Sequence, residues 1–288
     1  MPLSPNGPKL RYTLLGSGAS GGVPRLGGLD GSGNWGNCDP ANPKNHRKRC
    51  ALLVERIGAN GVTRILVDAG PDIRQQLLDA RVTHLDAVLF THDHADHTHG
   101  LDDLRLVFFL MRRKLESWAD ARTRDILFDR FGYAFETPPG SNYPAILNFN
   151  LIAQATQHCP HRFLPIRIPG AGGEIEALPF ATAHGSMDAL GFRFRNHGGD
   201  VAYLPDVSDM SDAAWEAVED LEYWLLDALR YDPHPSHANL ETALRWIEKA
   251  RPKKAVLTNM NIELDYDRVA AETPAHVVPA YDGMVIET

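Results

Sequence analysis

The amino-acid sequence predicts one large α/β domain. Short apolar segments of strand length alternate with amphipathic segments of helical period along both halves of the chain. The 288 residues are 43% hydrophobic and 23% charged, which supplies enough apolar material for a core and too little net charge for a disordered chain. Because no linker-like or low-complexity stretch divides the sequence, we take residues 1–288 as a single domain.

The first half of the chain is dominated by expected strands. Runs of apolar residues predict them at residues 9–15, 50–56, 61–68 and 85–90, the last fully buried. Residues 72–80 predict a short amphipathic helix with Pro71 at its first position. Residues 101–118 place Leu, Val and Phe on one helical face, which predicts a helix. Residues 119–172 are rich in proline and aromatic residues, and no periodicity orders them.

The second half repeats a pattern in which a strand is followed by a polar residue. Strands are expected at residues 174–184, 191–196, 201–206, 223–229 and 253–259. Helices are expected at residues 212–219 and 239–250. Ligands of α/β proteins bind at the carboxyl ends of the strands. We therefore expect the polar residues of both halves to converge on one edge of the domain.

Composition excludes several classes of protein. The 29 Lys and Arg against 37 Asp and Glu give a net charge of −8, which argues against a partner made of duplex nucleic acid. No apolar run of 18 residues is present, and the N-terminal segment lacks the apolar region of a secretory signal. Three cysteines give no disulfide framework. These features predict a cytoplasmic protein without a membrane partner.

Histidine is the unusual component, with 13 in the chain and four of them between positions 92 and 99. The segment Thr-His-Asp-His-Ala-Asp-His begins directly after the expected buried strand. His92 and His94 are two residues apart, so a short loop can direct both rings at one ion, while Asp96 and His97 can face a neighbouring position. Nitrogen and oxygen ligands without cysteine favour zinc or manganese. We therefore expect two divalent metal ions held close together, as in hydrolytic two-metal sites.

This segment resembles the signature of the metallo-β-lactamase superfamily, and the remaining motifs follow in the same order over roughly residues 10–286. Asp68 stands where the family keeps a supporting aspartate. His184, in ATAHGSM, matches the next ligand histidine, and Asp206, in YLPDVSD, matches the aspartate that bridges both metals. The resemblance implies a four-layer αβ/βα sandwich with a dinuclear site at one edge.

Three features indicate which branch of the superfamily the sequence resembles. The loop LLGSGASGGVP, at residues 14–24, is similar to the N-terminal loop of phosphoribosyl 1,2-cyclic phosphate phosphodiesterases. A bridging Asp206 in place of cysteine resembles the phosphodiesterase and tRNase Z branches. His237 precedes an expected helix, where a histidine of the phosphodiesterase branches protonates the leaving oxygen. His234 is the neighbouring alternative for that role.

The sequence departs from the family pattern in two places. Asn259 stands where the last ligand histidine is usual, and an amide oxygen binds zinc more weakly than imidazole does. We expect a tight first site (His92, His94, His184, Asp206) and a weaker second site (Asp96, His97, Asp206, Asn259). In the N-terminal loop, where the relative uses several cysteines for a structural zinc, only Cys38 is present, so no such zinc is expected. Cys50 and Cys159 are expected in the core.

These features predict a metal-dependent phosphodiesterase that acts on a small phosphorylated substrate, such as a cyclic phosphate or a nucleotide. Metal-bound hydroxide would attack phosphorus, with His237 as general acid and Asp96 as both ligand and catalytic residue. The glycine-rich loop matches the G-x-G-x-x-G dinucleotide pattern, but Pro24 and further glycines prevent the helix that this motif needs. The hydroxyl groups of Ser17 and Ser20 are instead expected to contact a substrate phosphate.

Three other functions stay open at this point. The glycine-rich loop and residues 71–80 also resemble the pyrroloquinoline quinone biosynthesis protein B, although the intact histidine motif favours hydrolysis. A degenerate nucleotide-binding module without turnover is suggested by Asn259. A tRNase Z-like nuclease is disfavoured by the acidic charge and by the lack of a recognisable tRNA-grasping arm. A homodimer is the default expectation for the assembly.

Overall fold

Two mixed β-sheets of seven strands each form the centre of the protein in the computed structural model, which describes residues 9–154 and 163–288. The first sheet has the spatial order β14 (Met284–Glu287), β1 (Lys9–Gly16), β2 (Ala51–Gly58), β3 (Gly61–Val67), β4 (Ala87–Leu89), β5 (Leu115–Ala119) and β6 (Leu147–Leu151). The second has the order β13 (Val277–Pro279), β12 (Lys254–Thr258), β11 (Tyr223–Asp227), β10 (Val201–Leu204), β9 (Met187–Arg195), β8 (Ile175–His184) and β7 (Ile166–Ile168).

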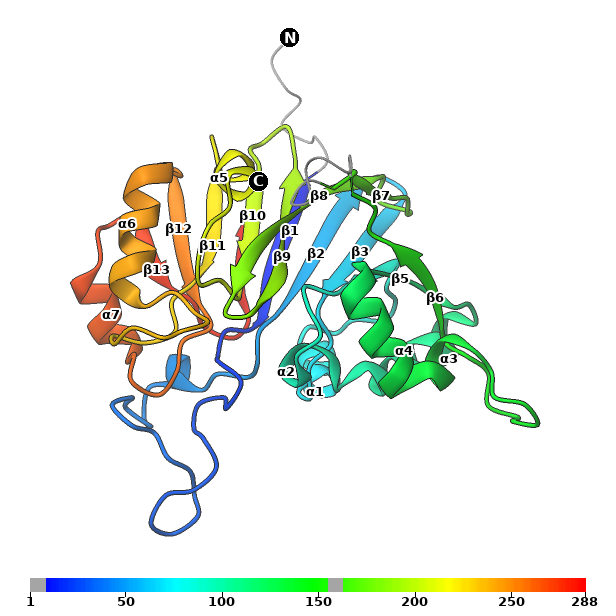
Figure 1. Cartoon of the computed structure of the whole chain (residues 1–288), viewed down its shortest axis with the longest axis horizontal. Helices are drawn as coiled ribbons and strands as arrows, with labels where there is room; N and C mark the ends of the chain where they lie inside the picture. The colour runs from blue at the N-terminus through cyan, green and yellow to red at the C-terminus, as the bar shows by residue number, and fades with distance from the viewer. Residues whose placement is uncertain (1–8, 155–162) are drawn as a thin grey trace.

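Helices cover the outer faces of both sheets and complete a four-layer sandwich (Figure 1). Those on the side of the first sheet are α1 (Ile73–Asp79), α2 (Ala95–Thr98), α3 (Leu104–Met111) and α4 (Ala121–Phe135). Those on the side of the second sheet are α5 (Asp212–Ala217), α6 (Leu240–Ala250) and α7 (Tyr266–Glu272). Short 3₁₀ turns lie at Pro43–Asn45 and Leu101–Asp103. The sandwich implied by the sequence motifs is confirmed.

The core follows from the alternation of side chains along the strands. Leu52 and Val54 of β2 point between the sheets, whereas Leu53 belongs to the layer between the first sheet and its helices. Phe192 and Phe194 of β9, both with 0% of their surface exposed, fill the central layer from the other side. Removing a side chain of this kind costs roughly 3–5 kcal/mol. The two sheets therefore share one packed layer, which fixes their edges relative to each other.

Parallel pairing places several strand ends together. Strands β3 to β6 are parallel, as are β10 to β13. The segments that follow β4, β10, β11 and β12 therefore leave the sandwich at their carboxyl ends. The glycine-rich segment between β1 and β2 projects from the sandwich as a long arm (Figure 1). Leu26 and Leu29 near its tip are fully exposed.

Three expectations about elements were wrong. The helix expected over residues 101–118 ends at Met111, because Arg112 adopts a left-handed conformation (φ 54°) and the chain then enters β5. The segment 119–172 contains the 15-residue helix α4, which begins at an Asp120 cap that accepts a hydrogen bond from the Thr123 amide. Helix α1 begins at Ile73, so Pro71 precedes it by two residues.

Among the described residues, no helix combines the length and the apolar character needed to cross a membrane.

Candidate metal centre

A cluster of histidine and aspartate side chains lies where the sequence analysis expected the site. His92 and His94 follow β4, His184 ends β8, and Asp206 follows β10. The segment after β4 leads into α2, a helix of four residues that carries Asp96 and His97. Residues from both sheets thus meet at one edge of the sandwich, as the strand directions require.

Three histidines form the first group of candidate ligands. His92, His94 and His184 have ring nitrogens that all lie within 4.8 Å of one another. The Nε2 atom of His184 lies 3.2 Å from the Nδ1 atom of His94, and the ring of His92 is 4.6 Å from that of His94 and 5.0 Å from that of His184. Three imidazoles that converge in this way are a typical ligand set for zinc.

His92, His97 and Asp206 form a second group with the same 4.8 Å spacing. The Nε2 atom of His97 lies 2.9 Å from Oδ2 of Asp206 and 3.5 Å from Oδ2 of Asp96. His92, His97 and Asp206 are at most 2% exposed. Asp206 thus lies between the two groups, since its Oδ1 atom is also 4.0 Å from Nε2 of His184.

The residues fit a divalent cation, and the decisive observation is a set of buried atoms without hydrogen bonds. Nε2 of His92, Nε2 of His97 and Oδ2 of Asp206 are all buried and lack a hydrogen-bond partner. Nε2 of His97 and Oδ2 of Asp206 lie 2.9 Å apart, but their geometry is not that of a hydrogen bond. Two ligands of one ion would face each other in this way. A buried polar atom left unpaired is costly, and a cation between these atoms would satisfy all of them.

Neighbouring groups hold three of the histidines, His92, His97 and His184, in the orientation that a ligand needs. Thr91 donates its hydroxyl hydrogen to Asp68 (2.8 Å), so the same oxygen accepts a hydrogen bond from Nδ1 of His92 at 2.9 Å. Nδ1 of His97 donates to Oδ2 of Asp68 at 2.7 Å, and Nδ1 of His184 donates to the Ser236 carbonyl at 2.6 Å. When the rings are neutral, each of these three Nε2 atoms is left with its lone pair, which is the arrangement that orients metal-binding histidines.

Burial, and after it the charge of His97, lowers the pKa of His92 well below its usual value. His92 is therefore neutral across the physiological range, as a metal ligand must be.

His237 lies beside the cluster, with its ring 4.7 Å from that of His184. Its Nδ1 atom lies 2.9 Å from Oδ2 of Asp227 and 3.3 Å from Oδ1 of Asp206. Burial acts to lower the pKa of His237, but the Asp227 carboxylate outweighs it and raises the pKa to about 9. The ring is therefore protonated at neutral pH. His184, Asp206 and His237 also satisfy the 4.8 Å ligand spacing, so geometry alone allows His237 a second role as ligand.

Asn259 follows β12 in a left-handed conformation (φ 59°). Its side-chain nitrogen lies 3.2 Å from Oδ1 of Asp206 and 3.1 Å from Oδ1 of Asp227. Carboxylate oxygens only accept hydrogen bonds, so the amide nitrogen, not the oxygen, faces them. In this structure Asn259 is a donor that links two carboxylates, and its expected role as a ligand of the second metal stays a prediction.

The two serines of the glycine-rich loop are differently placed. Ser17 is fully buried, and both its amide and its hydroxyl donate to Oδ1 of Asp282 at 3.0 Å. The expected contact of Ser17 with substrate is wrong for this structure, because its hydroxyl hydrogen already has a buried acceptor. Ser20 is exposed, and its carbonyl accepts a hydrogen bond from Arg49.

Comparison with known proteins fits this geometry. The profile of the β-lactamase superfamily domain matches residues 63–260. The chain belongs to the metallo-β-lactamase superfamily. A crystal structure of a diphosphatase of the PhnP family superposes with a TM-score of 0.79 at 29% identity, over 97% of each chain.

Two further proteins are similar in sequence to this chain. An octanoyltransferase of Porphyromonas gingivalis is 31% identical over 96% of this chain, which spans about half (51%) of that protein. The coenzyme PQQ synthesis protein B of Xanthomonas axonopodis is 24% identical, over 76% of this chain and 72% of that one.

The sequence did not single out three residues that contribute to the candidate metal centre: Asp227, Thr91 and Ser236. Asp227 ends β11 and is 0% exposed. It had a detectable signal, because a polar residue at the end of a buried strand is the pattern that identified Asp206. Ser236 acts through its backbone carbonyl, which no residue type reveals.

Cys38 and Cys50 are buried thiols, and Cys159 lies outside the described residues. The run at residues 44–49 is rich in basic residues, but Arg47 within it is only 2% exposed. Its Nη1 atom lies 3.7 Å from Sγ of Cys38 and donates to the Asn261 carbonyl at 3.2 Å. Arg47 therefore ties the glycine-rich arm to the loop that carries Asn259.

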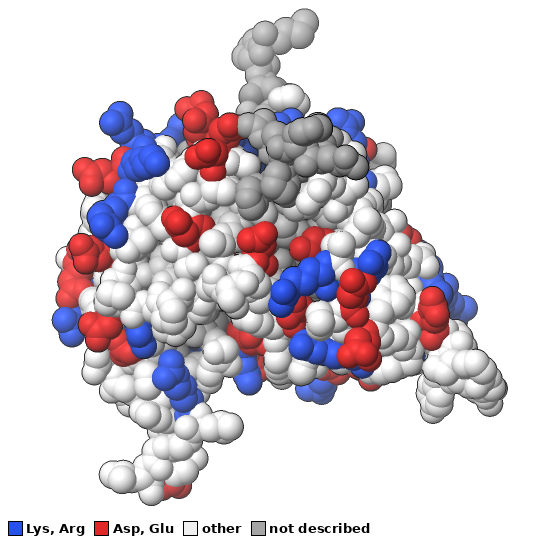
Figure 2. Space-filling view, in the orientation of Figure 1, with Lys and Arg blue, Asp and Glu red and all other residues white. Residues whose placement is uncertain are grey.

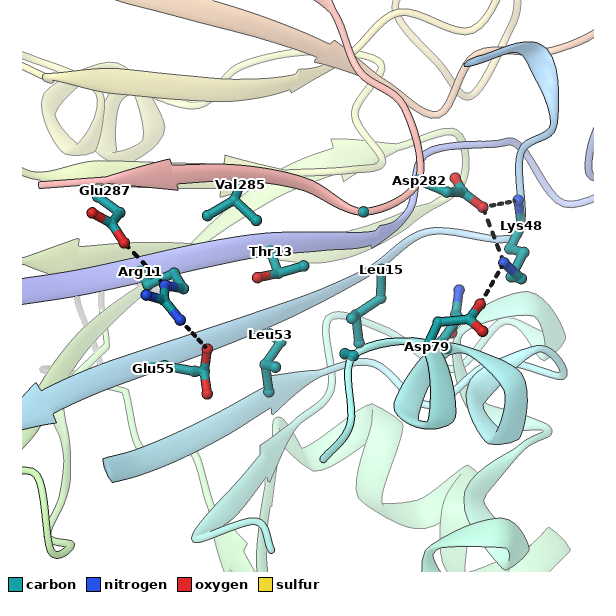
Figure 3. A pocket seen from close by; sticks show the side chains of 13 residues that line it. Arg11, Thr13, Leu15, Lys48, Leu53, Glu55, Asp79, Asp282, Val285 and Glu287 are labelled. Carbon is teal, nitrogen blue, oxygen red and sulfur yellow. Dashed lines mark hydrogen bonds and ion pairs between the residues drawn. The ribbon is translucent and has the colours of Figure 1, made fainter. Parts of the chain in front are cut away.

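A separate pocket of about 410 Å³ lies on the outer face of β14, β1 and β2 (Figure 3). Its apolar floor includes Leu15 and Leu53. The charged side chains around it are paired with one another, in the contacts Arg11–Glu287, Arg11–Glu55, Lys48–Asp79 and Lys48–Asp282. None of the candidate ligands lines this pocket, so we place the functional site at the histidine cluster.

Proposed function

We propose that the chain is a metal-dependent phosphodiester hydrolase that acts on a small phosphorylated substrate. One observation carries the proposal: His237, held by Asp227 at 2.9 Å, stands beside a converging His and Asp cluster with unpaired buried ligand atoms. The similarity to a diphosphatase of the PhnP family supports phosphorus chemistry in particular.

The cluster would hold two divalent ions, zinc or manganese. The first position would use His92, His94, His184 and Asp206, and the second Asp96, His97 and Asp206. When bound, such ions lower the pKa of a water molecule and stabilise negative charge on the phosphoryl oxygens. The second position would be the weaker one, because Asn259 supplies a hydrogen-bond donor to Asp206 there.

His237 supplies the proton in this proposal. Asp227 accepts the hydrogen bond from its Nδ1 atom, so the Nε2–H group is left to donate. As water attacks phosphorus, the P–O bond to the leaving group breaks, and the proton of Nε2 passes to the departing oxygen. The products are an alcohol and a phosphate monoester. Asp227 does not touch the substrate but fixes the ring and favours its charged form.

A small substrate is favoured over a nucleic acid by the charge distribution. Lys and Arg are interspersed with Asp and Glu on the face shown in Figure 2, which presents no continuous basic surface. A glycine-rich arm does project from the edge of the sandwich (Figure 1), whereas the sequence-based expectation concerned only an arm of the tRNA-grasping kind. Residues 26–36 of this arm contain no Lys or Arg, so the phosphate grip that an RNA-binding arm needs is missing there.

A role in cofactor biosynthesis is the second candidate, favoured by the 24% identity to a coenzyme PQQ synthesis protein B. We do not carry octanoyl transfer to this chain, because the chain spans only 51% of the relative that bears that name. A panel of phosphodiesters with added manganese, including bis-p-nitrophenyl phosphate and cyclic nucleotides, separates the candidates. Turnover of a diester supports hydrolysis. Absence of turnover with every substrate and metal favours the cofactor role or a binding module.

A further inference from the structure

A second cavity, of about 480 Å³, has walls that contact the segment carrying His92 and His94, and its volume is within the size range of small-molecule sites. Ile152 and Phe163 line it from the chain between β6 and β7, and Ala181 and Leu190 from β8 and β9. All four are at most 8% exposed. The floor is therefore apolar and rigidly packed.

Two contacts join this cavity to the metal-binding loop. Arg122, at the mouth of the cavity, donates from Nε to Oδ2 of Asp93 at 3.0 Å, and Asp93 stands between His92 and His94 in the sequence. The Leu190 amide donates to the Thr91 carbonyl at 2.9 Å. The cavity wall and the segment that carries the first ligands are thus one hydrogen-bonded unit.

The charges at the mouth show what the cavity can accept. Asp120 and Asp188 line it along with Arg122. The guanidinium of Arg122 is already paired with Asp93, so the two carboxylates at the mouth are not neutralised by it. A second phosphate group would meet these carboxylates, and repulsion between like charges would disfavour it. An uncharged apolar group would instead bury surface against the floor at no electrostatic cost.

We propose that this cavity binds an uncharged aromatic or alkyl group of the substrate while the phosphoryl group lies at the metal centre. The inference rests on the proposed function and narrows it to phosphoesters that carry one compact apolar substituent. It disfavours extended polynucleotides, whose neighbouring phosphate would have to enter the same mouth.

Binding of phosphonates tests the cavity without turnover, because their C–P bond is not an ester linkage. Phenylphosphonate and methylphosphonate are titrated calorimetrically into the manganese-loaded protein. We expect the wild-type protein to bind phenylphosphonate about tenfold more tightly. Ala153→Trp, at an exposed position that lines the cavity, should abolish this preference. The matched control Ala271→Trp, exposed on α7 away from the cavity, should keep it.

A second blocking variant, Ala121→Trp, at the exposed first residue of α4, covers the case in which Ala153→Trp does not fold. The proposal is overturned if the wild-type protein shows no preference for the phenyl compound, if it binds neither compound, or if the folded blocking variants keep the preference. Hydrolysis of phosphodiesters is measured separately. Absence of turnover together with a phenyl preference lost on blocking would reject the proposed reaction and retain the binding cavity.

Discussion

Nδ1 of His237 lies 2.9 Å from Oδ2 of Asp227, a buried carboxylate at the end of β11. This contact fixes the orientation of the ring and favours its charged form. It therefore connects a strand end in the core to the proton that the proposed reaction needs.

The pH dependence of activity should report this pair. The pKa of His237 is raised to about 9, so the acid form is present below that pH and is lost as the pH rises through it. We expect kcat/KM to fall above about pH 9. In Asp227→Asn the carboxylate that raises the pKa is gone, so the alkaline limb should move toward the ordinary value of 6.5. If activity falls at the same alkaline pH in the wild-type protein and in Asp227→Asn, a group other than His237 causes the fall.

Removal of the ring should depend on the leaving group. In His237→Ala we expect hydrolysis of an alkyl phosphodiester, whose alkoxide needs a proton, to slow by about 10²–10⁴-fold. Hydrolysis of bis-p-nitrophenyl phosphate should change far less, because p-nitrophenolate leaves without protonation. The comparison is made with metal content matched between the proteins. Equal losses on both substrates would indicate that His237 acts as a ligand or a structural residue instead.

Thr91 offers a test of metal affinity without removal of a ligand. Thr91→Val deletes the hydroxyl that orients His92 and donates to Asp68. Loss of such an orienting group costs 10- to 100-fold in metal affinity, measured here by competition with a chromophoric chelator. Thr182→Val is the control, because Thr182 is equally buried but bonds the Ala189 carbonyl. Unchanged affinity in Thr91→Val would contradict the assignment.

The second metal position can be strengthened by one substitution. Asn259→His places an imidazole where the superfamily pattern expects a ligand, and histidine is among the residues that tolerate the left-handed conformation found there. We expect the ratio of metal to protein after dialysis to rise toward two. Asn261→His, which changes a neighbouring amide that bonds Glu263, should leave it unchanged. A ratio that does not respond to Asn259→His would place the second ion elsewhere.

Much of the site could be predicted from the sequence because its chemistry is local. The spacing of His92, His94, Asp96 and His97 after a buried strand is set within one loop, so the motif alone indicates their convergence. His184 and Asp206, each of which ends or follows a strand, could be assigned through the resemblance of their motifs to a known family. The sandwich followed from the same motifs through their resemblance to a known family.

The remainder depends on contacts made only after folding. Ser17 has the residue type of a phosphate-binding group, but its hydroxyl bonds Asp282, 265 residues away. Arg47 belongs to a basic run, yet it is buried against Cys38 and Asn261. Helix α4 is interrupted by a non-helical Phe131, which obscures its period. Contacts between residues that are far apart in the sequence cannot be predicted from a local sequence pattern.

Hydrolysis of bis-p-nitrophenyl phosphate before and after metal removal tests the central claim most directly. The purified protein is treated with a chelator, assayed, and assayed again after addition of manganese or zinc. We predict turnover that is lost on chelation and restored by the metal in the wild-type protein, and that is not restored in Asp206→Ala. Turnover that survives chelation, or that the metal restores equally in Asp206→Ala, would contradict the account.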